Sequence, residues 1–204
     1  MKRSVNKRTM LNKATKGPGR VIILSGPSGA GKTTLQDLLL KSPFFAGRIM
    51  RSISATTRQP RGTEQEGREY FFISRQKFEG MIRRGEFLEW ARVFDQYYGT
   101  PMKRVDAVLK GGKSVLLCID VQGGRQVKRI MPDAVAVFVK TPTLKELCRR
   151  LEARRTDAAQ SIALRLGTAR QELKEARFYD HVLVNDDLES TRKRLETFLT
   201  TQGV

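Results

Sequence analysis

Cysteine and long apolar runs are both scarce in this sequence, and their scarcity excludes two classes of protein. The 204 residues include only two cysteines, Cys118 and Cys148, too few for a disulfide-stapled scaffold and in keeping with a reducing compartment. The longest uninterrupted apolar run, residues 134–139, has 6 residues, whereas a membrane-spanning helix needs about 20. No apolar segment follows the basic start, as a secretory signal requires. We therefore expect a globular cytoplasmic protein without a membrane partner.

Acidic residues are also few: the sequence has 21 Asp and Glu against 39 Lys and Arg, which gives a formal net charge of +18. Such a charge predicts anionic partners, namely nucleic acid, a membrane surface or phosphorylated small molecules. Residues 1–20 hold seven of the basic side chains and no acidic or aromatic residue, so we expect residues 1–19 to be a basic, disordered extension. A nucleic-acid tether is the alternative, but the segment lacks aromatic side chains on which bases stack.

From residue 20 onward, short apolar runs alternate with helical patterns, which predicts one α/β domain over residues 20–204. Fully apolar runs are typical of strands in a parallel sheet with helices on both faces, and they lie at 21–24, 115–119, 135–139 and 182–184. Helical spacing of apolar residues marks 143–154 and 188–199. Residues 48–103, richer in arginine and aromatic side chains, predict a small insertion beside the core, and 154–165 predict a lid.

Residues 26–33 match the phosphate-binding pattern G-x-x-x-x-G-K-[ST]. Its glycines let successive backbone N–H groups point at phosphate oxygens, and the helix expected after them adds its positive end. Lys32 can reach the β- and γ-phosphates, whereas Thr33 and the strand-end Asp120 can contact Mg²⁺. The predicted ATP-binding residues here are Gly26, Ser28, Gly29, Ala30, Gly31, Lys32, Thr33 and Thr34. An incidental Gly-rich turn is the alternative, and the apolar strand before the loop argues against it.

A second predicted anion site contains Arg58 and Arg61, which project from a turn stiffened by the proline between them. Planar guanidinium groups suit bidentate recognition of phosphate, and Glu64 can orient one of them by ion pairing. The hydroxyls of Tyr70 and Tyr98 can add neutral donors. Taken alone, this segment would be a solvated basic loop. Beside a phosphate-binding loop, it predicts a site for a phosphate acceptor.

Glu89 and the segment before Thr100 suit the reading of a nucleotide base. A carboxylate can accept two parallel hydrogen bonds from guanine, through N1–H and the amino group, and adenine offers no such pair. Hydroxyls such as those of Ser54 and Thr100 can address O6 of guanine, and a site built for such hydrogen bonds discriminates strongly. The alternative for Glu89 is an exposed carboxylate on a strand.

Three arginines are candidates for stabilising the transition state of phosphoryl transfer. Arg150 and Arg154 are four residues apart on one predicted helix, away from its leucine face, and Arg165 follows on the next helix. Cations brought by loop closure neutralise the charge that spreads over the transferred phosphoryl oxygens. The alternative is a solvated basic helix face.

Together these residues resemble the guanylate kinase family from about residue 20 to residue 199. The blocks that carry the resemblance are GPSGAGKTT, SATTRQPRGTE, GREYFF, EFLEWA, YYGTP, IDVQGGRQV, RLEARRTD and VNDD, in that order. The resemblance implies a P-loop kinase fold with a core, a lid and a nucleotide-binding insertion. It also implies transfer of the γ-phosphoryl group of ATP to GMP with Mg²⁺, in purine metabolism. The sequence does not specify whether dGMP is accepted as well.

The resemblance also implies roles for individual residues by motif position. On the acceptor side, the GMP-binding residues are Ser54, Arg58, Arg61, Glu64, Tyr70, Glu89, Tyr98, Gly99 and Thr100. On the donor side, Asn185 joins the ATP-binding loop. The residues expected to act in catalysis are Lys32, Arg58, Arg150, Arg154 and Arg165.

One residue departs from the family pattern. Family members usually carry an acid two residues before the strand-end aspartate, where this chain has Cys118. A thiol is mostly uncharged at neutral pH, so it cannot pair with a GMP-site arginine, and we expect weaker GMP affinity. Three other functions stay open at this stage: a kinase for AMP, UMP or dTMP, a non-catalytic interaction module of the same fold, and a nucleic-acid-binding protein. The sequence does not specify an oligomeric state.

Overall fold

The computed structural model describes residues 19–93, 95–153 and 159–204, with side chains throughout these ranges except at 159–163. Within them, parallel strands form a five-stranded sheet in the order β2-β7-β1-β8-β9. The strands are β1 (Val21–Ser25), β2 (Ile49–Arg51), β7 (Ser114–Cys118), β8 (Val135–Lys140) and β9 (His181–Val184). Four of them coincide with the apolar runs, which confirms the predicted parallel sheet. The predicted extension lies outside the described residues, apart from Gly19.

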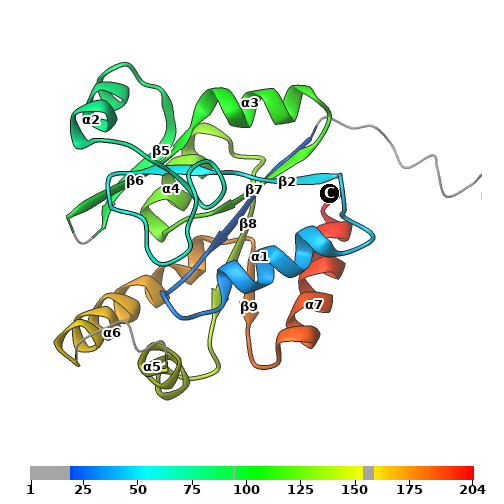
Figure 1. Cartoon of the computed structure of the whole chain (residues 1–204). Coiled ribbons are helices and arrows are strands. Elements are labelled where there is room, and N and C mark those ends of the chain that lie inside the picture. The colour runs from blue at the N-terminus through cyan, green and yellow to red at the C-terminus, as the bar shows by residue number, and fades with distance from the viewer. Residues whose placement is uncertain (1–18, 94, 154–158) are drawn as a thin grey trace, which may run out of the picture.

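Helices cover both faces of this sheet (Figure 1). Ile22 and Leu24 of β1 pack with α1 and α7 on one face, whereas Val21 and Ile23 pack with α3 and α4 on the other. Because both faces are buried, residues 21–24 of the strand are all apolar. The covering helices are α1 (Lys32–Lys41), α3 (Met102–Lys110), α4 (Val121–Ile130) and α7 (Leu188–Thr201). This architecture is the α/β P-loop kinase fold that the sequence predicts.

A second, mixed sheet has the strand order β4-β3-β6-β5. Its elements are β3 (Ser54–Thr56), β4 (Tyr70–Phe72), α2 (Arg75–Arg83), β5 (Phe87–Val93) and β6 (Gln96–Pro101). Phe78 of α2 anchors it by stacking on Phe87 and Tyr97, with ring centroids 4.4 and 5.2 Å away. These elements fall within residues 48–103, but β2, in the same range, pairs with β7 in the core sheet.

The carboxyl ends of the parallel core strands meet at one edge of the sheet, where ligands bind in open α/β folds. Strand β1 leads into the glycine loop, β7 is followed by Asp120 and β9 by Asn185. Residues separated by more than 100 positions therefore share one edge.

Two further helices lie beside this edge. Helix α5 (Leu144–Glu152) starts at Thr143, whose hydroxyl accepts a hydrogen bond from the Glu146 amide at 3.1 Å. Leu147 and Leu151 of α5 pack on α6 (Ala159–Lys174), which continues into the short 3₁₀ helix η1 (Glu175–Phe178). Of the predicted lid, residues 154–158 lie outside the described residues and the remainder forms the first part of α6. In the described part of the chain, no helix has the length and apolarity needed to cross a membrane.

Candidate active site

The glycine loop has a backbone that only glycine adopts readily at three positions. Gly26, Gly29 and Gly31 have φ values of +136°, +89° and +93°. A Cβ atom at Gly26 would overlap the carbonyl oxygen of Val139, and one at Gly31 would overlap the side-chain amide of Asn185. The loop therefore packs closely against β8 and the chain after β9, which leaves no room for a side chain at Gly26 or Gly31.

Lys32 begins α1 directly after this loop. Its ammonium group donates to the carbonyl oxygens of Gly26 and Pro27, at 2.6 and 3.0 Å, which places the charge at the loop together with the positive end of α1. Ser28, Thr33 and Thr34 are exposed here, whereas Gly26, Gly29 and Ala30 are buried. The geometry suits a polyphosphate held by loop and helix end.

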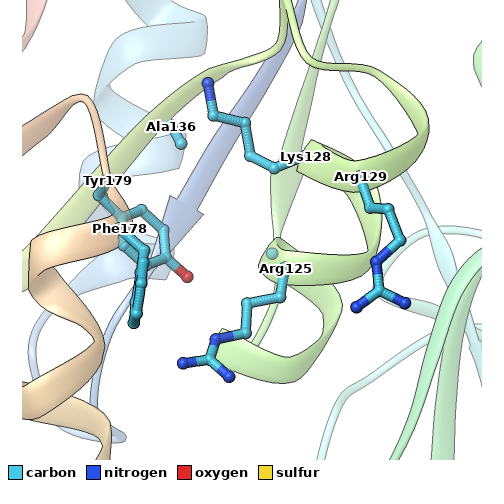
Figure 2. A pocket seen from close by; sticks show the side chains of 7 residues that line it. Arg125, Lys128, Arg129, Ala136, Phe178 and Tyr179 are labelled. Atoms are coloured by element: carbon cyan, nitrogen blue, oxygen red, sulfur yellow. The ribbon is translucent and has the colours of Figure 1, made fainter.

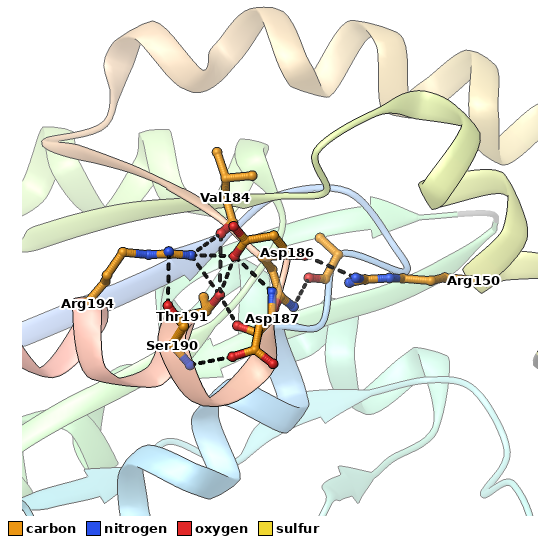
Figure 3. Close-up of polar contacts among 9 residues, drawn as sticks. Arg150, Val184, Asp186, Asp187, Ser190, Thr191 and Arg194 are labelled. Atoms are coloured by element: carbon orange, nitrogen blue, oxygen red, sulfur yellow. Dashed lines mark hydrogen bonds and ion pairs between the residues drawn. The ribbon is translucent and has the colours of Figure 1, made fainter.

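Asn185 holds the glycine loop in place through a hydrogen bond. It is only 3% exposed, and its side-chain amide donates to the Ala30 carbonyl oxygen at 2.8 Å. Figure 3 shows the turn around it: Arg194 of α7 donates to the Val184 carbonyl at 2.7 Å and to the Asp186 carboxylate at 2.6 Å. The predicted ATP-binding residue Asn185 thus bonds to the loop itself, and Arg194 is a supporting residue that sequence reasoning missed.

The predicted transition-state arginines have different settings. Arg150 donates to the Glu146 carboxylate at 2.7 Å and to the Asn185 carbonyl at 3.0 Å, so it links α5 to the edge of the core (Figure 3). Side-chain hydrogen bonds from Arg149 and Arg150 lower the pKa of Glu146 to about 2. Arg165 is half-buried on α6, and Arg154 lies outside the described residues.

The second anion site is a compact cluster in the second sheet. Arg58 is 9% exposed and donates to both oxygens of Glu64, each at 2.7 Å. The same carboxylate accepts the Arg61 backbone N–H at 2.8 Å. Hydrogen bonding from Arg58 lowers the pKa of Glu64, so this pair stays ionised. Glu64 therefore orients Arg58, as predicted.

Aromatic rings pack against this cluster. Tyr70 lies under Arg58, 5.0 Å from the guanidinium carbon to the ring centroid, and meets Tyr98 edge-on at 5.9 Å. Ser54 is half-buried and lies directly opposite Tyr70 in the parallel pairing of β3 with β4. The exposed Arg61 side chain completes the group.

Glu89 lies on β5, an edge strand of the second sheet, and is only 4% exposed, not the solvated carboxylate of the alternative interpretation. It accepts the hydroxyl hydrogen bond of the fully buried Thr100 at 2.6 Å, across the pairing of β5 with β6. Burial raises the pKa of Glu89 to about 7, although the Thr100 hydrogen bond opposes the shift. Next to Thr100, Gly99 has no space for a side chain, because a Cβ atom there would lie 2.9 Å from the Phe87 ring.

Asp120 caps α4, accepting the Gly123 amide hydrogen bond at 2.8 Å. Burial raises the pKa of its carboxyl group. In the described part of the chain, His, Cys, Asp and Glu side chains form no cluster of three that could hold a metal ion. A Mg²⁺ ion here would depend on phosphate oxygens together with Thr33 and Asp120, which fits its preference for few carboxylates and bound phosphates.

Two residues near the loop have surroundings that the sequence did not indicate. Glu172 of α6 has a pKa raised to about 7 by burial, with Lys32 and Asp120 as its charged neighbours. A single acid in a helix that also carries three basic residues gives no sequence signal. Cys118 has Thr33 within hydrogen-bonding reach and Lys32, Arg51 and Asp37 as charged neighbours, and it also lies near Tyr70 of the acceptor site.

A separate hollow of about 290 Å³ lies between α4 and η1, lined by Arg125, Lys128, Arg129, Phe178 and Tyr179 among others (Figure 2). Arg125 is paired with Glu175 and stacks over Phe178 at 4.6 Å. Lys128 is paired with Asp180 at 3.0 Å. These pairs link α4 to η1 and to the turn that follows it.

Comparisons with known proteins point to one family. A family model described as guanylate kinase matches residues 18–202. The guanylate kinase of Rubrobacter xylanophilus is 47% identical over 87% of this chain and 91% of its own length. That of Clostridioides difficile is 42% identical over 90% of this chain and 88% of its own.

Comparison with solved structures points to the same family. The guanylate kinase from Anaplasma phagocytophilum matches with a TM-score of 0.77 and 32% identity, over 94% of this chain and 90% of that one. TT1252 from Thermus thermophilus matches with a TM-score of 0.52 and 15% identity, over 91% of this chain and 98% of that one, and shares the fold.

Proposed function

Since this chain belongs to the guanylate kinase family of ATP:GMP phosphotransferases, we propose that its glycine loop holds ATP and its second sheet holds GMP. The chain is a nucleotide-binding kinase, and the alternatives of another base specificity or a non-catalytic module are not supported. The observation that carries the division of sites is the buried Glu89–Thr100 pair, which offers a carboxylate to a base beside the Arg58–Glu64 cluster.

On the donor side, the loop backbone and Lys32 bind the β- and γ-phosphates of ATP. Phosphate oxygens replace the carbonyl oxygens of Gly26 and Pro27 as partners of the Lys32 ammonium group. Asn185 keeps the loop in shape through Ala30, and its contact with Arg150 brings that arginine to the same edge. Arg150, Arg154 and Arg165 would neutralise charge on the transferred group.

On the acceptor side, Arg58 and Arg61 bind the GMP phosphate with the hydroxyls of Tyr70 and Tyr98 as further donors. Glu89 accepts hydrogen bonds from guanine N1–H and the amino group, with Thr100 and Ser54 beside it. The attacking phosphate oxygen is already anionic, so no general base is needed. Positioning and electrostatic stabilisation then supply the rate.

We propose Mg²⁺ as the divalent ion that this family generally needs. The Thr33 hydroxyl and the Asp120 carboxylate are oxygen ligands of the kind Mg²⁺ prefers. When bound with ATP, the ion would neutralise charge between the β- and γ-phosphates. We also propose the cytoplasm as the compartment, in keeping with Cys118 and Cys148 being free thiols.

Replacing the loop lysine tests this arrangement. Lys32→Ala should lower kcat by roughly 10³-fold, because the transferred charge loses its fixed cation, while the dissociation constant for GMP stays within about twofold. Lys41→Ala, an exposed lysine at the other end of α1, is the matched control and should behave as wild type. Calorimetric GMP binding and steady-state kinetics would be measured for both variants. Full turnover in Lys32→Ala would reject the proposed donor site.

A further inference from the structure

The first turns of α4 touch both halves of the active site. The backbone N–H of Gly123 donates to Asp120 on the donor side at 2.8 Å. On the acceptor side, a Cβ atom at Gly123 would lie 3.0 Å from Cδ of Glu89 and nearer still to Oε2. The absence of a side chain at Gly123 therefore lets the Glu89 carboxylate lie directly against the helix.

One turn along α4, Gln126 bonds twice to the strand that carries Glu89. Its side-chain oxygen accepts the Trp90 backbone N–H at 3.2 Å, and its side-chain N–H donates to the Trp90 carbonyl oxygen at 2.7 Å. Strand β5 is an edge strand, so the outward backbone groups of Trp90 need a partner from outside the sheet. The Gln126 amide supplies both the donor and the acceptor that a neighbouring strand would supply.

These two bonds hold the strand at the residue next to Glu89. Two ion pairs of α4 lie instead beside the hollow of Figure 2, from Arg125 to Glu175 and from Lys128 to Asp180. Within the described residues, the hydrogen bonds that join α4 to β5 both involve Gln126. Losing them frees β5 to shift relative to the helix against which Glu89 lies.

We propose that Gln126 is a positioning residue for recognition of the acceptor base, acting through the Trp90 backbone to fix Glu89 beside Gly123. The inference rests on the proposed function of Glu89 as the group that reads guanine. Guanine offers N1–H and an adjacent 2-amino group, hypoxanthine offers N1–H alone, and adenine has no N1–H and carries its amino group at C6 instead. A carboxylate held in one place distinguishes these three bases, and a carboxylate that moves distinguishes them less.

Gln126→Met tests the proposal, because methionine keeps the length of the side chain and removes both hydrogen bonds. Lys128→Met is the control: it also places a methionine on α4, and it removes the contacts of Lys128 with Asp180 and with the Pro132 and Ala134 carbonyl oxygens instead. The preference for GMP over IMP and over AMP would be measured as ratios of kcat/KM, together with KM for ATP and the thermal unfolding midpoint. We expect Gln126→Met to lower the GMP:IMP ratio about tenfold, the effect of losing part of two hydrogen bonds, with KM for ATP within about twofold.

A merely structural role would lower the unfolding midpoint in both Met variants and leave the base ratios alone. Equal base ratios in Gln126→Met and Lys128→Met would overturn the proposal. Gly123→Ala places a methyl group against Glu89 and should lower the GMP:IMP ratio as well. Gly167→Ala, which has no atom near the added methyl group, is its control and should leave that ratio unchanged. This second pair keeps the test valid if Gln126→Met does not fold.

Glu89→Gln separates this inference from the proposed function beneath it. If Glu89→Gln discriminates GMP from IMP as well as wild type does, the base-reading role of Glu89 fails and the role of Gln126 fails with it. If Glu89→Gln loses discrimination and Gln126→Met keeps it, the proposed function survives and the inference about Gln126 is wrong.

Discussion

The raised pKa of Glu89 makes the affinity for GMP depend on pH, and the variant Glu89→Gln separates this dependence from the titration of Glu172 on the donor side. Burial raises the pKa of Glu89 to about 7, and only the ionised carboxylate can accept both guanine hydrogen bonds. Lowering the pH protonates Glu89, so KM for GMP should rise as the pH falls through 7. With a pKa of about 7, the ionised fraction falls from about 0.97 at pH 8.5 to about 0.24 at pH 6.5, which predicts an increase of about fourfold.

The assay is steady-state turnover at saturating ATP, with GMP varied at each pH from 6.5 to 8.5. This range stays above the second pKa of a phosphate monoester, about 6, so the substrate changes little. Glu89→Gln is the control, since glutamine can still accept from Thr100 but does not titrate. Its KM for GMP should be higher at every pH and should no longer change across the range. A flat wild-type profile, or the same slope in Glu89→Gln, would refute the reasoning.

Three other substitutions probe the loop, the anion cluster and the departure from the family pattern. Gly31→Ala should raise KM for ATP and lower the free energy of unfolding by about 1–3 kcal/mol in urea titration, because φ is +93° and the methyl meets Asn185; wild-type values would contradict this. Glu64→Gln should raise KM for GMP on the order of tenfold and leave KM for ATP unchanged, as Arg58 loses its charged partner; an unchanged KM for GMP would count against the cluster. Cys118→Asp should lower KM for GMP in the same kinetics, because position 118 lies near Tyr70 of the acceptor site and a carboxylate there can bond to the nucleotide; an unchanged value would remove the role given to the thiol.

The sequence predicted those parts of the site that are formed by residues close together in the chain. The glycine loop follows from spacing and a preceding apolar strand, and its three left-handed glycines agree with that pattern. The pairing of Arg58 with Glu64 also spans a few residues, so charge and a stiff turn sufficed. The parallel sheet followed from strands that are apolar on both faces.

Contacts between distant segments could not be predicted in the same way. Asn185 bonds to Ala30 across 155 residues, and Gln126 reaches Trp90 across 36. Neither side chain carries a charge or a spacing that names its partner. The place of strand β2 in the core sheet was also not predicted. Its run is short and partly exposed, so its order depends on pairing with β7 and not on its own pattern.

The central claim is transfer of phosphate from ATP to GMP at a site built by the glycine loop and the second sheet. The most direct measurement is one coupled assay of wild-type enzyme with ATP, Mg²⁺ and each of GMP, AMP, UMP and dTMP in turn. We predict rapid turnover with GMP and rates lower by orders of magnitude with the other three, since only guanine offers Glu89 two adjacent donors. Equal turnover with AMP, or none with GMP, would contradict the account.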